Sequence, residues 1–227
     1  MYFEKQYSPS DYPVQKVLCN QVPKHIICAF VNLFKKESVL LRGGFAYVIY
    51  SGNEKYVLKD FDMLAKIEDK CALITILQNS AKDVYLNQNK FGNFVITAFW
   101  EYNHLFFKLD ILLQDELVDC NKVMWHEILV PCVSEEYLWY NSICKIAEKS
   151  VRLHDDEKTR KHIQMSLDMA DIILRNKKKI DINVSLDAVK TKIQEASDIA
   201  KNLVDDEKYL KFVNVQNLFL SSWLNQK

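Results

Sequence analysis

The sequence contains little glycine and little proline, with four residues of each among 227. Collagen-like and low-complexity chains need far more of both, so these classes are excluded. Hydrophobic residues make up 49% and charged residues 26% of the chain, as in a protein that folds and not in a disordered one. A chain of this length forms one large domain or two small ones, each with a buried core.

The chain also lacks an excess of either charge, because 30 Lys and Arg balance 30 Asp and Glu. No overall field therefore draws it to nucleic acid or to an anionic membrane. The six cysteines form no Cys-x-x-Cys pair, which predicts reduced thiols and a cytoplasmic protein. A run of about 18 apolar residues and a signal-peptide pattern are both missing, so we expect neither a membrane span nor secretion.

The first half of the chain mixes helical and strand patterns. Apolar residues at three- and four-residue steps predict a helix over 23–36, and a short apolar run predicts a strand over 38–42 that ends at Gly43 and Gly44. The pattern then predicts a helix over 45–50, a strand over 56–64, a helix over 65–81 and a hairpin of strands 93–100 and 105–113.

The second half changes character, with helical spacing and no convincing strand. Helices are predicted over 134–152, 157–178, 185–204 and 209–223, with Ser185 as an N-cap. The fold class is therefore predicted to be α+β, with a mixed sheet flanked by helices in residues 1–120 and a helical bundle in residues 121–227.

Three aspartates stand out because they interrupt strand-like runs. Asp60 and Asp62 are two residues apart and are expected to share one face of a strand, while Asp110 shares a face with Lys108 on a later strand. A bare carboxylate inside an apolar strand is costly unless it is paired or ligated. Together the three predict a site for a pair of divalent ions, whereas taken singly each fits a solvated face of an edge strand.

Two of the four glycines, Gly43 and Gly44, follow one strand directly. Without Cβ atoms they let backbone N–H groups approach a phosphate at the start of the next helix, although a Gly-Gly pair alone is more often only a turn. A strand that ends in Gly-Gly, then Asp60-Phe-Asp62, then Asp110 is a specific order of parts.

This order resembles the nucleotidyltransferase superfamily, the polymerase-beta-like fold, over about residues 23–115. The resemblance implies an enzyme that transfers an NMP from an NTP donor to a hydroxyl-bearing acceptor. It implies that Asp60, Asp62 and Asp110 are catalytic and hold two Mg²⁺ ions, and that Gly43 and Gly44 bind the phosphates.

Within the superfamily the chain looks most like the abortive-infection toxin type. Lys145 and Arg152 match that branch's Lys and Arg seven residues apart, and Asp168 and Asp171 match its later Asp pair except that Leu167 replaces a basic residue. This resemblance implies that Lys145 and Arg152 bind the nucleotide, that tRNA or protein is the acceptor, and that a partner protein silences the toxin. A small-molecule acceptor stays open.

Three positions depart from the pattern of that branch. Phe45 follows Gly-Gly where a hydroxyl residue is usual, and Tyr56 and Leu58 replace an Arg-x-Ser before the first aspartate pair. The alternative hypothesis is therefore a catalytically degenerate member that keeps the fold and serves as a binding or interaction module.

Overall fold

The computed structural model describes residues 2–3, 11–89, 92–125, 127–149, 155–176, 180, 182 and 184–226. It divides into two compact units, Met1–Val133 and Ser134–Lys227. Within the described ranges the first unit contains the strands and the second contains helices, which confirms the predicted α+β class. The unit boundary falls at Val133 and not at the predicted residue 120.

The first unit is built on a mixed sheet of eight strands in the order β1-β6-β7-β8-β5-β3-β10-β9. β5 runs parallel to β8, whereas β3 pairs with β5 and β7 pairs with β8 in antiparallel fashion. A separate pair of short strands, β2 (Val17–Leu18) and β4 (Val57–Leu58), lies outside this sheet. The eight strands are β1 (Tyr2–Phe3), β3 (Val39–Arg42), β5 (Phe61–Lys66), β6 (Asp83–Gln88), β7 (Phe94–Tyr102), β8 (Leu105–Gln114), β9 (Cys120–Trp125) and β10 (Ile128–Val133).

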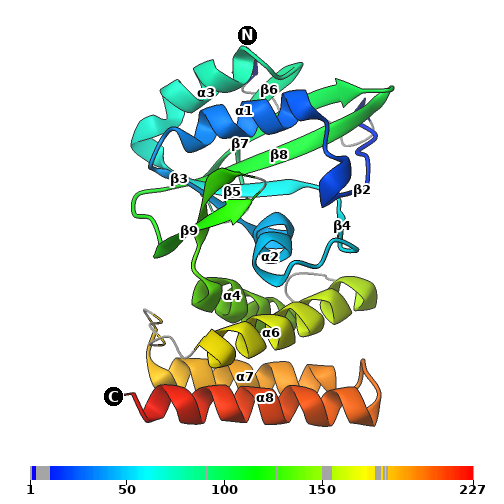
Figure 1. The fold of residues 1–227 in the computed structure, drawn as a ribbon, viewed down its shortest axis with the longest axis vertical. Coiled ribbons are helices and arrows are strands. Elements are labelled where there is room, and N and C mark those ends of the chain that lie inside the picture. The colour runs from blue at the N-terminus through cyan, green and yellow to red at the C-terminus, as the bar shows by residue number, and fades with distance from the viewer. Residues whose placement is uncertain are drawn as a thin grey trace. The chain divides into compact units, whose positions relative to one another are not determined.

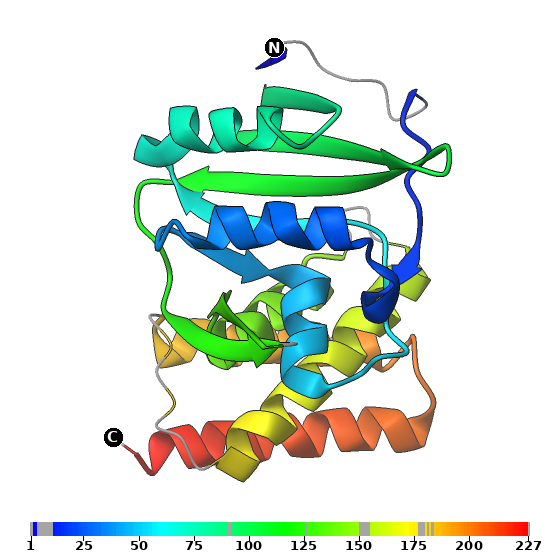
Figure 2. The same cartoon turned by 45° about the horizontal axis from the view of Figure 1, so that its top comes forward.

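Two helices, α1 (Lys24–Phe34) and α3 (Lys70–Gln78), lie side by side on one face of the sheet (Figures 1 and 2). From α1, the Phe30 ring packs against Phe61 at 4.9 Å and Trp100 at 5.9 Å between ring centroids. Successive strand residues point to opposite faces, so Asp62, which follows Phe61, points away from these rings. The apolar face is thus covered and the carboxylates lie on the other face.

Several predicted elements of the first half are confirmed. The helix over 23–36 is α1, the strand over 38–42 is β3, and the hairpin is β7 and β8. The short helix predicted over 45–50 is α2 (Gly43–Ser51), which begins two residues earlier, so the glycine pair belongs to its first turn.

Two predictions around the first aspartates are wrong in detail. The strand predicted over 56–64 is divided into β4 and β5 by a break at Lys59 and Asp60. The helix predicted from residue 65 starts only at Lys70, because Ala65 and Lys66 continue β5 and a short 3-10 turn follows. Long-range pairing of β5 with β8 extends the strand beyond what the local pattern suggested.

The absence of strands after residue 120 is also a wrong prediction. β9 and β10 form an antiparallel hairpin, and β10 pairs with β3 where Cys132 lies opposite Leu41. Val130, Cys132 and Val133 are fully buried. This hairpin extends the sheet and moves the unit boundary to Val133.

The second unit consists of four long helices in the described ranges, which confirms the predicted helical bundle. They are α4 (Glu135–Ala147), α6 (Asp156–Asn176), α7 (Leu186–Ala200) and α8 (Asp206–Leu224). Ser185 caps α7 as predicted, since its hydroxyl accepts the Ala188 N–H at 3.3 Å. In the core, Trp139 stacks on Phe219 at 4.0 Å and its indole N–H donates to Gln216 Oε1 at 2.8 Å.

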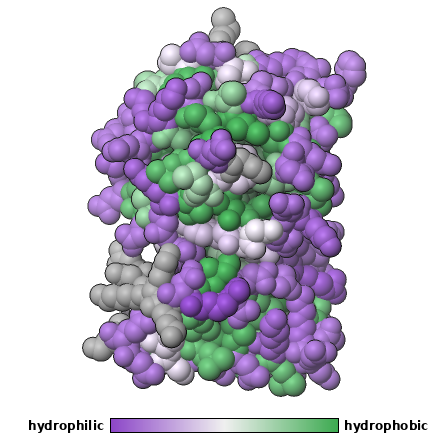
Figure 3. Space-filling model, in the orientation of Figure 1, coloured by the Kyte–Doolittle hydropathy of each residue, from purple (hydrophilic) through white to green (hydrophobic). Residues whose placement is uncertain are grey.

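Hydrophilic residues cover much of the face drawn in Figure 3, with hydrophobic surface among them over the C-terminal helices. On α8 the leucines Leu210, Leu218 and Leu224 are exposed. Among the helices that the structure describes, none combines the length and the apolar character that crossing a membrane requires.

Candidate functional site

A row of polar residues crosses five neighbouring strands of the sheet. In strand-to-strand register, Arg42 lies opposite Asp62, Asp62 opposite Asp110, Asp110 opposite Thr97, and Thr97 opposite Tyr85. Residues in direct register present their side chains on the same face. These five residues, here called the polar row, therefore share the face opposite the one that α1 covers. The structure thus brings together two of the three predicted carboxylates, Asp62 and Asp110.

Asp110 is a largely buried acid of the polar row. Its Oδ1 accepts a hydrogen bond from Thr97 Oγ1 at 2.7 Å, and its Oδ2 accepts one from Lys108 Nζ at 2.6 Å. The side chains of Asp110 and Lys108 are only 24% and 19% exposed. Burial raises the pKa of Asp110, against the opposite effects of Lys108 and Thr97, and the nearby Asp62 raises it further. The predicted shared face of Lys108 and Asp110 is confirmed as an ion pair.

Asp60 has a different position from the predicted one, because it precedes β5 and is not part of the strand. Burial, helped by the nearby carboxylates of Asp60 and Asp62, raises the pKa of the Tyr56 phenol to about 12. Among the residues that the structure describes, no three His, Cys, Asp or Glu side chains are placed together to hold a metal ion.

Carboxylate oxygens are the donors that Mg²⁺ prefers, and Asp62 and Asp110 present them side by side on one face. These two residues therefore fit a magnesium ion as a pair of ligands. Asp60 lies one residue before the strand that carries Asp62, and both lie near the Tyr56 phenol. The assignment of all three as metal ligands stays a prediction.

Gly43 and Gly44 form the first turn of α2 and lie against side chains of the protein itself. Gly43 has φ +67°, and a Cβ atom there would lie 2.5 Å from Asp62 Oδ2. A Cβ atom on Gly44 would lie 2.9 Å from Cε1 of Tyr56. The need for glycine is thus set by the close approach of Asp62 and Tyr56. The phosphate-binding roles of Gly43 and Gly44 stay predictions.

The three departures from the family pattern are packed residues. Phe45 is 1% exposed and packs its ring against Phe61 at 5.4 Å and Trp125 at 5.0 Å. Leu58 is 2% exposed, and Tyr56 covers Gly44. These side chains stabilise the start of α2 and the short strand before β5.

The remaining predicted site residues lie in the second half of the chain. Lys145 belongs to the last turn of α4, in the second unit. Arg152 lies outside the described residues. The nucleotide-binding roles of Lys145 and Arg152 stay predictions.

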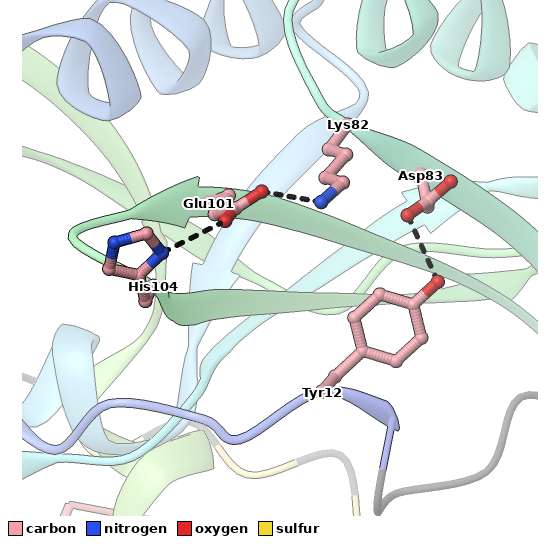
Figure 4. Close-up of polar contacts among 5 residues, drawn as sticks. All are labelled: Tyr12, Lys82, Asp83, Glu101 and His104. Atoms are coloured by element: carbon pink, nitrogen blue, oxygen red, sulfur yellow. Dashed lines mark hydrogen bonds and ion pairs between the residues drawn. The ribbon is translucent and has the colours of Figure 1, made fainter.

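A second polar cluster is drawn in Figure 4, and its Tyr12 contacts Tyr85 at the end of the polar row. The Tyr12 hydroxyl donates to Asp83 Oδ2 at 3.0 Å and also contacts the Tyr85 hydroxyl. Its ring stacks on Phe99 at 3.9 Å, and burial raises the pKa of Tyr12 well above its usual range. Beside it, Glu101 bonds Lys82 and lies 4.0 Å from His104 Nδ1, as Figure 4 shows. Because Tyr12, Asp83 and Tyr85 satisfy one another, these bonds tie this end of the row to the segment that carries Tyr12.

Sequence reasoning missed Arg42, Thr97 and Tyr85 as members of the site. Their signal lies in the strand register, which for Thr97 depends on the turn between β7 and β8. Asn103 and His104 both have positive φ, at 53° and 64°, as a two-residue hairpin turn requires. Recognising that turn would have placed Thr97 opposite Asp110.

No family model matches the chain, and no curated protein matches it. Among solved structures, it is similar to an antigenic nucleotidyltransferase-like protein from Paracoccidioides brasiliensis, with a TM-score of 0.57, 13% identity, and coverage of 92% of this chain and 95% of that one. JHP933 from Helicobacter pylori has a TM-score of 0.48, 14% identity, and coverage of 92% and 96%. ANT(2")-Ia in complex with adenylyl-2"-tobramycin has a TM-score of 0.48, 13% identity, and coverage of 80% and 99%.

The first of these similarities extends over nearly the whole of both chains. The chain therefore has the nucleotidyltransferase fold that its motifs predicted. The resemblance to the toxin branch stays a prediction.

Proposed function

From this nucleotidyltransferase fold, we propose that the protein transfers a nucleoside monophosphate from an NTP to a hydroxyl-bearing acceptor, with Mg²⁺ as cofactor. The observation that carries the proposal is the register pair of Asp62 and Asp110, which places two carboxylates on one sheet face beside the start of α2. An RNA, a protein or a small molecule can supply the hydroxyl, and the balanced net charge gives no separate support for RNA.

In this reaction the acceptor oxygen forms a bond to the α-phosphorus, and the bond from that phosphorus to the bridging oxygen breaks. The electron pair leaves with pyrophosphate, and the hydroxyl proton passes to a base. Asp60, Asp62 and Asp110 would hold two Mg²⁺ ions, which neutralise the negative charge that develops on the phosphate oxygens.

The contacts of Asp110 suit it for the role of a metal ligand. Thr97 and Lys108 each hold one of its oxygens, so its orientation is set before substrate arrives. Gly43 and Gly44, in the first turn of α2, would receive the phosphates beside Asp62, and Lys145 and Arg152 would bind the nucleotide.

A second candidate function is the degenerate binding or interaction module. Two observations favour it: Lys108 already neutralises Asp110, and Tyr56 fills the space next to Gly44. In this case the carboxylates would serve only the stability of the sheet.

Calorimetric titration with each of the four NTPs in the presence of magnesium tests the proposal. Wild type is compared with the double variant Asp62→Asn/Asp110→Asn and with Asp115→Asn, a control at an exposed aspartate just after β8. We expect binding of one NTP that the double variant loses and the control keeps. Binding of no NTP, or equal binding by the double variant, would support the degenerate module instead.

A further inference from the structure

Arg42 is the last residue of β3 and lies opposite Asp62 in the pairing of β3 with β5. Residues paired in this way carry their Cβ atoms about 4.5–5.5 Å apart on the same face. The backbone then continues directly into Gly43 and α2. Arg42 therefore brings a cation to the place where Asp62 meets the start of the helix.

The guanidinium of Arg42 is not fully satisfied within the part of the chain that the structure describes. Its Nε atom is shielded from solvent and has no hydrogen-bond partner there. No ion pair joins Arg42 to Asp62 among those residues, although the two lie opposite each other. An N–H group withdrawn from water is costly unless an acceptor reaches it. The position therefore favours an anion that arrives from outside.

We propose that Arg42 binds the polyphosphate chain of the donor nucleotide, an inference that rests on the function proposed above. A guanidinium presents five N–H donors in a planar fork, which matches the oxygens of a phosphate better than an ammonium does. As the bond to the α-phosphorus breaks, negative charge moves onto the pyrophosphate. Arg42 would hold that charge while Asp62 and Asp110 act at the α-phosphate.

The location explains why a polyphosphate suits this residue better than a single phosphate. The α-phosphate must lie near Asp62 and Asp110 to react, so the rest of the chain has to extend along the edge of the polar row. Arg42 is at the end of that row, next to the glycine turn.

The test uses inorganic triphosphate as a probe, titrated by calorimetry into the full-length protein with and without magnesium. Arg42→Gln removes the charge, Arg42→Lys keeps it without the fork, and Lys59→Gln removes an exposed charge from the bend before β5 as a matched control. Thermal unfolding of each variant shows whether it is folded. We expect Arg42→Gln to weaken triphosphate binding roughly 10- to 100-fold, the effect typical of a charge-assisted hydrogen bond.

Arg42→Lys should recover part of this loss, and Lys59→Gln should bind as wild type does. Failure of wild type to bind triphosphate, or an Arg42→Gln affinity within twofold of wild type, would overturn the inference. The proposed function is tested separately by the NTP titration. NTP binding that depends on Asp62 and Asp110 would support the transferase even if the role of Arg42 is refuted. Conversely, the protein could bind triphosphate through Arg42 and bind no NTP. That result would support the anion site and refute the transferase function.

Discussion

Asp62 and Gly43 are packed so closely that a Cβ atom on the glycine would lie 2.5 Å from Oδ2 of the aspartate. Gly43 also has φ +67°, a conformation that other residues rarely adopt. The start of α2 and the carboxylate of β5 therefore constrain each other, and the predictions below begin from this contact.

Replacing Gly43 with alanine should both destabilise the protein and displace Asp62. Gly52 offers a matched control, because it ends the same helix at φ +64° and a Cβ there would meet no atom within 4 Å. The left-handed conformation alone costs alanine about 1–2 kcal/mol, so Gly52→Ala should lower the free energy of unfolding by that amount. Gly43→Ala should lower it further and also weaken magnesium-dependent NTP binding. Urea denaturation and calorimetry measure the two effects, and equal losses in both variants would contradict the role of the Asp62 contact.

Removing one partner of the largely buried Lys108–Asp110 ion pair should destabilise the protein more than removing both partners. Lys108→Met leaves the Asp110 carboxylate with only Thr97 as a donor and should lower the free energy of unfolding by about 1–3 kcal/mol. Lys108→Met/Asp110→Leu should recover much of this loss, because it removes the buried charges together.

Urea denaturation at neutral pH measures these differences. The control is Lys66→Met, which breaks an exposed pair with Glu68 at 3.2 Å and should change stability by less than about 1 kcal/mol. A double variant less stable than Lys108→Met would show that the pair is a net source of stability.

The thiol of Cys19 should resist modification in the folded protein. Burial, as the main cause, raises its pKa to about 11, so at pH 8 it stays protonated and shielded. Because its folded pKa lies above the usual value, the stability that this thiol contributes is complete below that usual value and is lost as the pH rises towards 11.

Reaction with a chromogenic disulfide reagent at pH 8 checks this assignment. We expect the exposed Cys28, Cys71 and Cys120 to react rapidly, and Cys19 and Cys132 to react only after unfolding in urea. A Cys19→Ser variant should lose one slowly reacting thiol and keep the fast phase unchanged. Loss of a fast thiol in that variant would show that Cys19 is accessible.

The boundary at Val133 predicts which N-terminal fragment folds. A fragment of residues 1–133 keeps the pairing of Cys132 with Leu41 and the hydrogen bond from the Tyr50 hydroxyl to the Val133 carbonyl at 3.0 Å. A fragment of residues 1–120 loses both, together with the packing of Phe45 against Trp125. Thermal unfolding followed by circular dichroism should be cooperative for 1–133 only, and a cooperative transition of 1–120 would contradict the boundary.

Elements with a strong local pattern could be predicted from the sequence. The helices α1, α6 and α7 each bury one stripe of apolar residues, and such a stripe is visible at three- and four-residue steps. Likewise, Ser185 could be predicted as a cap because the bond it makes spans only three residues. In contrast, β6 and β9 carry few buried residues and lie near the edges of the sheet, so their apolar pattern was too weak to predict them.

The sequence by itself determined the mixed fold class and marked Asp62 and Asp110, because an acid within an apolar strand needs a partner wherever that strand lies. Only the tertiary structure decided that Asp62 lies opposite Asp110, that Arg42 and Thr97 extend the same row, and that Asp60 precedes the strand. These relations depend on the register of strands that are distant in the chain. Register follows from a turn such as Asn103–His104 and from packing over the whole sheet, and a local pattern of residues contains neither.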